Sequence, residues 1–130
     1  MVGYSGTPLA KKLGIKDGSI VAVRGEHIPD LPPEVCSTPG GVAPFDVLAV
    51  FVTEEATLRA EIVALGAAIR RNGGLWICWP KKSARKVVPS DITEDTVRDV
   101  ALPLGLVDNK VCAIDEVWSG LRLVWRKELR

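Results

Sequence analysis

The chain has 130 residues, of which 47% are hydrophobic and 25% charged, which is the balance of one ordinary globular domain spanning residues 1–130. Its 17 Lys and Arg residues face 16 Asp and Glu residues, so the formal net charge is +1 and we do not expect nucleic acid as a partner. No segment approaches the roughly 20 apolar residues of a membrane span, and the start lacks a signal-peptide pattern, which together predict a cytoplasmic protein without a membrane partner.

The first third of the chain contains two short predicted elements and a long loop. A Thr-Pro pair before an apolar stretch predicts a helix over Pro8–Leu13, and the β-branched run Ser19–Arg24 predicts a buried strand. Five prolines and two glycines in residues 26–45 predict mostly loop, with Glu34–Ser37 as a candidate short strand.

The middle of the chain predicts a strand, a helix and a second strand. The near-continuous apolar run Asp46–Val52 has the length of a strand that is covered on both faces. Thr53 is the predicted N-cap of a helix that runs to Arg71 and is closed by Gly73. Leu75–Trp79 is the next predicted strand, again buried on both faces.

The last third predicts one more helix and a hairpin. Asp91, with Glu94 three residues later, forms a capping-box pattern that predicts the start of a helix. Val107–Ile114 and Leu121–Arg126 are the predicted final strands, joined by a turn around residues 118–120.

Alternation of strands and helices predicts the fold class. A strand, helix, strand unit forms a right-handed crossover between parallel strands, whereas the connection between the last two strands is too short to cross over. We therefore expect a single-domain, three-layer, Rossmann-like α/β fold with a mixed sheet, mostly parallel and ending in an antiparallel C-terminal hairpin. This layout resembles the second half of a methyltransferase fold.

The turn after the first strand argues against a cofactor. Nucleotide and adenosyl groups are usually held by a glycine-rich turn at this place, where bare backbone approaches the ligand. Here the strand runs into Arg24, Gly25, Glu26 and His27, with one glycine and no G-x-G pattern. The sequence thus predicts no cofactor.

The segment from Trp79 to Lys86 is the most site-like feature of the sequence. Ligands of open α/β sheets bind at the carboxyl ends of parallel strands, and this segment leaves such an end. Trp79 supplies an apolar wall, and Lys81 and Lys82 supply charges for an anionic small molecule. The competing interpretation, which we favour, is a solvated loop with tryptophans that pack on helices.

Trp118 and Ser119 form the second candidate site, because polar residues stand there beside a large ring. A carboxylate pair at Asp115 and Glu116 would serve acid–base chemistry, but adjacent strand residues point to opposite faces, so a structural turn is the favoured interpretation.

The cysteine and histidine content predicts neither a metal site nor a catalytic residue. Cys36, Cys78 and Cys112 are odd in number and far apart, which favours free thiols in a reducing compartment. No Cys or His residues have the spacing of metal ligands. A thiolate–imidazole pair of Cys36 with His27 remains as a minor alternative.

Three stretches are similar to a family of short bacterial proteins known only as a domain of unknown function. They are YSGTPLAKKLGI at Tyr4–Ile15, GLWICWPKK at Gly74–Lys82, and the whole of Asp91–Arg130. The resemblance runs nearly end to end. It implies a stand-alone cytoplasmic domain, with no activity, cofactor or catalytic residue to carry over.

Two functions remain open from the sequence. The preferred one is a non-catalytic binding or protein-interaction module, with a homodimer through an antiparallel edge strand at Leu121–Arg126 as one form of it. The alternative is a small enzyme that acts on an anionic metabolite at the strand end of residues 79–82. We prefer the first because no residue set offers both a nucleophile or base and its orienting partner.

Overall fold

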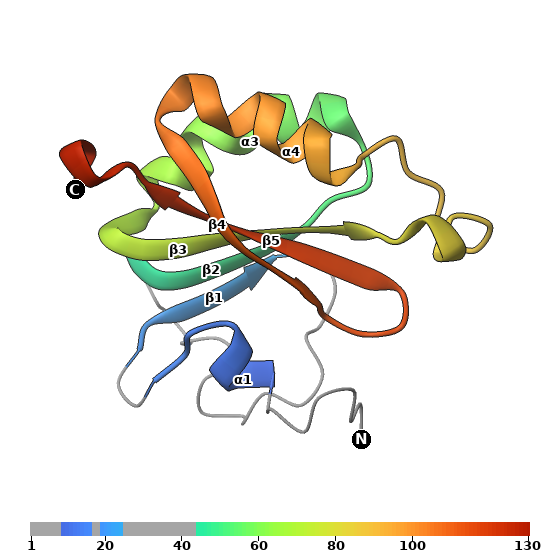
Figure 1. Cartoon of the computed structure of the whole chain (residues 1–130), viewed down its shortest axis with the longest axis horizontal. Helices are drawn as coiled ribbons and strands as arrows, with labels where there is room; N and C mark the ends of the chain where they lie inside the picture. Colours follow the sequence, from blue (N-terminus) through green and yellow to red (C-terminus); the bar gives the residue numbers. More distant parts are fainter. Residues whose placement is uncertain (1–8, 17–18, 25–43) are drawn as a thin grey trace.

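The sheet of this protein has a spatial order that differs from its order in the chain (Figure 1). The computed structural model describes residues 9–16, 19–24 and 44–130. In these residues, strands β1, β2 and β3 are parallel neighbours, and β5 runs antiparallel between β3 and β4. The strands are β1 (Val21–Arg24), β2 (Phe45–Phe51), β3 (Ile69–Pro80), β4 (Leu106–Ala113) and β5 (Trp118–Trp125).

Helices lie on both faces of this sheet. Helices α3 (Glu55–Ala67) and α4 (Glu94–Ala101) cover one face, and the short helix α1 (Leu9–Lys12) lies against the other (Figure 1). The predicted fold class, a layered α/β domain with a mostly parallel mixed sheet, is therefore confirmed.

Strand β3 divides the hydrophobic core into two clusters. Side chains alternate along a strand, so Leu75, Ile77 and Trp79 point to the side of α3 and α4, whereas Trp76 and Cys78 point to the side of α1. All five are buried. A strand that is covered on both faces has no polar alternation, which is why its sequence is a continuous apolar run.

Trp76 fixes α1 to the sheet. Its indole N–H donates a hydrogen bond to the backbone carbonyl of Leu13, with 3.1 Å between Nε1 and O, and both residues are fully buried. The ring passes close to Gly120 on β5, where an added Cβ would lie 3.1 Å from Trp76 Cε3. Gly120 is therefore required for packing.

The predicted boundary between the middle helix and the next strand is wrong. Helix α3 ends at Ala67, and Arg70, Arg71 and Gly73 belong to β3 instead of closing the helix. The reason is an irregularity in the pairing of β2 with β3, which accommodates extra β3 residues before Gly74. At Gly73 an added Cβ would lie 2.9 Å from the Asp46 carbonyl oxygen, so the glycine permits this close approach.

The predicted cap of the last helix is also displaced. The N-cap of α4 is Thr93, which exchanges hydrogen bonds with Thr96 in a capping box. Asp91 lies before this helix and binds the N-terminus of a different one, as described below.

The predicted final turn and the predicted edge strand are both wrong. Residues 118–120 belong to β5, and the turn precedes them, held by Asp115 Oδ1, which accepts hydrogen bonds from the backbone N–H groups of Val117 and Trp118. Because β5 pairs with strands on both sides, Leu121–Arg126 has no free edge for a partner. Within the described sheet the edges are β1 and β4.

Several predictions fall on residues outside the described ranges. They are most of the loop at residues 26–45, the candidate strand Glu34–Ser37, and the pairing of His27 with Cys36.

Candidate functional site

The tryptophans of the two candidate sites, Trp79 and Trp118, lie on opposite faces of the sheet. Trp79 pairs with Ser119 and packs in the core beneath α3 and α4. Trp118 pairs with Pro80 and packs in the cluster on the α1 side, where its ring meets that of Phe51 edge to face at 5.1 Å between centroids. Both tryptophans are buried, so they do not form one wall of a pocket.

The lysines of the predicted site lie on the loop that follows β3. The backbone N–H of Lys81 donates to the carbonyl of Val117, and Lys82 is exposed at the start of a single 3-10 turn, Lys82–Ala84. The structure thus groups Trp79 with Ser119 at one strand pair and leaves Lys82 in solvent.

Side chains of the chain itself bind at the strand edge that we considered for an anion as the alternative to a solvated loop. At the end of β2, the Thr53 carbonyl accepts a hydrogen bond from Ser90 Oγ at 2.8 Å, and the first-turn N–H of α3, at Glu55, donates to Asp91 Oδ1 at 2.7 Å. A helix N-terminus favours a negative group, and here the Asp91 carboxylate is that group. One backbone N–H of this helix N-terminus is therefore already bonded to a carboxylate of the chain.

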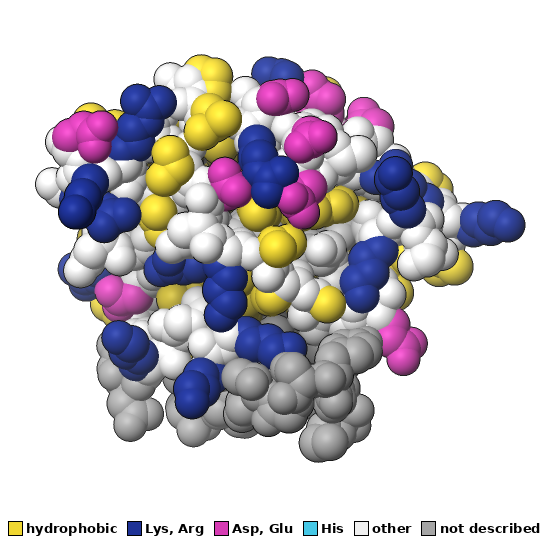
Figure 2. All heavy atoms as spheres, viewed as in Figure 1, with side chains coloured by type: hydrophobic (Ala, Val, Ile, Leu, Met, Phe, Trp, Pro, Cys, Tyr) yellow, Lys and Arg dark blue, Asp and Glu magenta, His cyan; other side chains and the backbone are white. Residues whose placement is uncertain are grey.

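A basic hollow on the α1 side of the sheet has the strongest site character among the described residues. It has a volume of about 250 Å³. Figure 2 shows Lys and Arg side chains over the whole of the visible face, several of them in the lower half of the view, on the side of the sheet where α1 lies. Four of its six lining residues are cations and none is acidic. The basic hollow is lined by Lys11, Lys12, Gly14, Asn109, Lys110 and Arg122.

Long-range contacts assemble this hollow. The ammonium of Lys110 on β4 donates to the backbone carbonyl of Lys12 at 3.0 Å, which joins the edge strand to the end of α1. The chain then turns at Gly14, whose φ of +81° is in the left-handed region that favours glycine.

Arg122 is the half-buried member of the basic hollow. Burial lowers the pKa of its guanidinium, and the positive charge of Arg130 lowers this pKa further. No described carboxylate forms a salt bridge with it. An added Cβ at Gly74 would lie 2.5 Å from Arg122 Nε, so the guanidinium rests against the bare backbone of that glycine. A partly desolvated cation without a carboxylate is suited to an external anionic group.

A second hollow, which we call the edge hollow, lies on the other side of β4. It has a volume of about 280 Å³ and shares Asn109 and Lys110 with the basic hollow. The edge hollow is lined by Arg98, Asp108, Asn109, Lys110, Val111 and Leu121.

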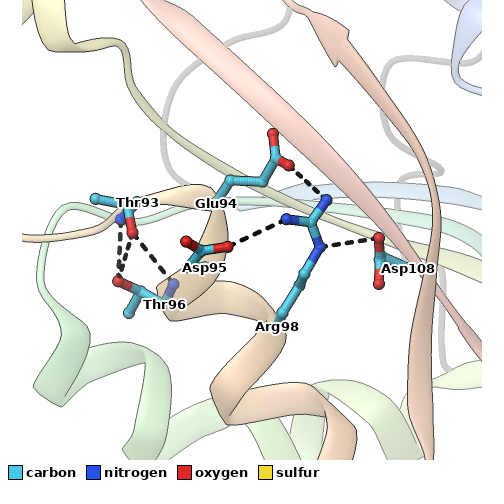
Figure 3. A network of polar contacts seen from close by, with 6 residues as sticks. All are labelled: Thr93, Glu94, Asp95, Thr96, Arg98 and Asp108. Atoms are coloured by element: carbon cyan, nitrogen blue, oxygen red, sulfur yellow. Dashed lines mark hydrogen bonds and ion pairs between the residues drawn. The ribbon is translucent and has the colours of Figure 1, made fainter.

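Carboxylates surround Arg98 in the edge hollow (Figure 3). Its guanidinium lies 3.0 Å from Asp108 Oδ2 and 3.3 Å from Asp95 Oδ1, and it also pairs with Glu94. Hydrogen bonds that the guanidinium donates to Asp108 and Glu94 raise the pKa of Arg98. This network joins α4 to β4, and the single guanidinium offsets part of the charge of three carboxylates.

The sequence analysis missed both hollows. Lys11 and Lys12 lie in a stretch interpreted only as a helix, and Arg122 lies in the segment that was expected to form an edge strand. No local signal connects Lys12 with Lys110, which are 98 residues apart in the chain. Only the insertion of β5 between β3 and β4 brings these cations together.

Several solved structures of methyltransferase-fold proteins are similar to this chain. Magnesium protoporphyrin IX methyltransferase from Synechocystis PCC 6803, with bound SAH, matches with a TM-score of 0.55 and 13% identity, over 83% of this chain and 74% of that one. Fibrillarin from Aeropyrum pernix, with bound S-adenosyl-L-methionine, matches at 0.56 and 13%, over 95% and 71%. The fibrillarin pre-rRNA processing protein of Methanococcus jannaschii matches at 0.56 and 11%, over 92% and 69%.

At these sequence identities the structural similarity establishes only the fold of the chain. The chain also spans only 57% of the length of another matched structure, from Sulfolobus solfataricus. No protein-family model and no curated protein sequence matches the chain. The resemblance to short bacterial proteins therefore stays a prediction.

Two expectations from the sequence are contradicted by this comparison. We expected a non-catalytic binding or protein-interaction module, or else a small enzyme for an anionic metabolite, but the fold is that of SAM-dependent methyltransferases. We also expected an anionic small molecule or a homodimer and did not expect nucleic acid. Two of the matched structures instead hold S-adenosyl compounds, and a third is a pre-rRNA processing protein.

An S-adenosyl group does not fit the strand ends that the structure describes. Ser90 and Asp91 already bind the backbone at the β2 end. The parallel strands also advance from β1 to β2 to β3 in one direction, so the described sheet lacks the reversal of strand order that opens a crevice for such ligands. No chemical step is assigned to this group here.

The residues that the structure describes include no helix that is long and apolar enough to cross a membrane. They also contain no group of three or more His, Cys, Asp or Glu side chains arranged to hold a metal ion.

Proposed function

We propose that this protein binds nucleic acid, and that it does so through phosphate contacts in the basic hollow. The observation that supports this proposal is the half-buried guanidinium of Arg122, which has no described carboxylate partner and lies among Lys11, Lys12 and Lys110. A phosphodiester oxygen pair matches the planar N–H fork of arginine, and lysines add point charges around it.

The volume of the basic hollow favours one group of a larger molecule. Sites that enclose a whole small ligand have volumes of about 300–1,000 Å³. The basic hollow, at about 250 Å³, is smaller and is rimmed by lysines that reach into solvent. A phosphate enters such a space while the rest of a polymer lies outside it.

The net charge of the chain does not oppose this proposal. The value of +1 averages over the whole surface, and the acidic residues near β4 are paired with Arg98 rather than placed in the basic hollow. A local cluster of cations releases the counterions of the phosphates it neutralises, whatever the total charge. The fold also occurs in a pre-rRNA processing protein, which supports this class of partner.

The test is the salt dependence of oligonucleotide binding. Fluorescence anisotropy with a labelled single-stranded oligonucleotide of mixed sequence would compare the parent protein with Lys11→Ala/Lys12→Ala, Lys110→Ala and Arg122→Gln. Each lost phosphate contact lowers the slope of log affinity against log salt by about 0.7. Lys82→Ala, which removes an exposed cation outside the basic hollow, is the matched control and leaves the slope unchanged.

A second variant acts on Arg122 without changing any charge. Gly74→Ala places a methyl group where the guanidinium rests, and the flexible end of the arginine moves away at small cost in stability. We expect weaker binding with a nearly unchanged melting temperature. Absence of oligonucleotide binding by the parent protein at low salt, or equal losses in Lys82→Ala and Lys110→Ala, would overturn the proposal.

A further inference from the structure

We infer that the edge hollow receives a nucleobase, and that the nucleic acid is therefore single-stranded. This inference rests on the proposed binding of phosphate in the basic hollow. It adds a second site on the opposite side of β4, with a different chemistry and its own test.

The two hollows are contiguous at one irregular point of the edge strand. The register of β4 against β5 shifts between Asp108 and Lys110, so Asn109 lies at a bulge. Asn109 and Lys110 line both hollows. A molecule whose phosphate lies in the basic hollow thus reaches the edge hollow by crossing β4, which is an edge of the described sheet.

The edge hollow is unsuited to a second phosphate. Its cation, Arg98, already pairs with Glu94, Asp95 and Asp108, and an added anion would meet these carboxylates. Lys110 is shared with the basic hollow. The edge hollow is suited instead to a neutral ligand group that has polar edges and apolar faces.

The remaining lining residues match a base of this kind. Val111 is 50% exposed and Leu121 is buried, so together they form an apolar wall and floor. The Asn109 amide has both donors and an acceptor, which is the inventory needed to pair with the edge of a base. A volume of about 280 Å³ accommodates one flat ring system.

A base can enter the edge hollow only if its faces and edge are accessible, and this condition distinguishes a single strand from a duplex. In a duplex the base is stacked and paired, so its faces and Watson–Crick edge are not available to a hollow beside the phosphate. A single strand turns its bases outward freely and bends across the edge of β4.

The experiment compares three probes of equal sequence or charge on the full chain: a single-stranded oligonucleotide, its abasic counterpart, and its duplex. We expect the parent protein to bind the single strand about fivefold more tightly than the abasic strand, because one base contact is lost. In the Val111→Ser and Asn109→Ala variants the ratio of the affinities for the normal and the abasic strand should fall toward one. The slope of log affinity against log salt should stay that of the parent protein. Both substitutions are neutral and remove no cation from the basic hollow; Val111→Ser is the cleaner of the two, because Asn109 also lines the basic hollow and Val111 does not.

The outcomes separate the two proposals. Equal binding of the normal and abasic strands by the parent protein, or a preference that survives in both variants, overturns the base site and leaves the phosphate site standing. Tighter binding of the duplex than of the single strand also overturns it. Absence of binding to all three probes removes the proposed function itself.

Discussion

The carboxylate of Asp91 accepts a hydrogen bond from the backbone N–H of Glu55, with 2.7 Å between the oxygen and the nitrogen, although the two residues are 36 positions apart. Glu55 begins α3, and the N-cap residue Glu54 provides no side-chain hydrogen bond of its own. The helix is therefore capped by a side chain from the segment that precedes α4. This contact joins two helices and also closes the strand end that a ligand would use.

The first prediction concerns this cap. Asp91→Ala should lower the free energy of unfolding by about 1 kcal/mol, because a first-turn N–H loses its acceptor and the helix dipole loses a negative charge. Asp91→Asn should lower the free energy of unfolding by less, since the amide oxygen can still accept the hydrogen bond from the Glu55 N–H. Urea denaturation followed by circular dichroism measures both; equal stability of the alanine variant and the parent would show that the contact contributes nothing.

The second prediction separates two reasons for glycine. Gly120→Ala should cost about 1–3 kcal/mol, because its Cβ would lie 3.1 Å from both Ile114 Cδ1 and Trp76 Cε3 in a closed core. Gly14 has positive φ but no atom within 4 Å of an added Cβ, so only its backbone resists substitution. Asparagine tolerates the left-handed region. At Gly14 the asparagine variant should therefore be more stable than the alanine variant, and at Gly120 it should be less stable. The reverse order of stability in denaturation experiments would contradict this account.

The third prediction concerns the Arg98 network. Arg98→Ala should lower the free energy of unfolding by about 1 kcal/mol, the upper end for partly exposed ion pairs, because one guanidinium serves three carboxylates. The matched control is Arg59→Ala, which removes a single exposed pair with Glu55 and should cost less than about 0.5 kcal/mol. If nucleic acid binds beside Lys110, Arg98→Ala should also weaken it, since the freed carboxylates repel phosphate. Comparable stability losses in the two variants would show that the network adds nothing to an ordinary surface pair.

The fourth prediction concerns pH. Burial raises the pKa of the Cys78 thiol, and the charges of Cys112 and Asp115 raise this pKa further. A thiol with a raised folded-state pKa is stabilising only while protonated, so its contribution is complete below the unfolded value of about 8.5 and is lost as pH rises above it. The free energy of unfolding should fall above that pH by up to about 1.4 kcal/mol per unit for this thiol.

Cys78→Ala tests this assignment, because it removes the thiol and leaves other titrating groups in place. Its stability should depend less steeply on pH than that of the parent over the alkaline range, measured by denaturation at a series of pH values. Parallel curves for the two proteins would mean that the alkaline loss comes from other residues.

Local sequence was sufficient for most elements because each pattern reports burial directly. The apolar runs at Asp46–Val52 and Leu75–Trp79 predicted strands covered on both faces, and both lie inside the sheet rather than at its edges. Element ends were less predictable. At Arg70 and Arg71 cations suit a helix C-terminus, but pairing of Ile69 with Phe45 and the irregularity before Gly74 make this segment a strand.

The candidate site was beyond prediction because its residues share no local pattern. An anion at Lys81 and Lys82 was considered because the neighbouring strand and helix ends were expected to be open, whereas Asp91 binds the N-terminus of α3. The cations of the basic hollow come from α1, β4 and β5. Their proximity depends on which strands pair.

Local patterns were enough to predict the number and type of the main elements, the parallel order of the first strands and the burial of β3, because periodicity and chain length limit how each segment buries its apolar side chains. Three features depend instead on tertiary packing: β5 enters between β3 and β4, Asp91 caps a distant helix, and Lys12, Lys110 and Arg122 line one hollow. Such contacts join residues far apart in the chain, and their free energy depends on the packing of the whole sheet rather than on any local pattern.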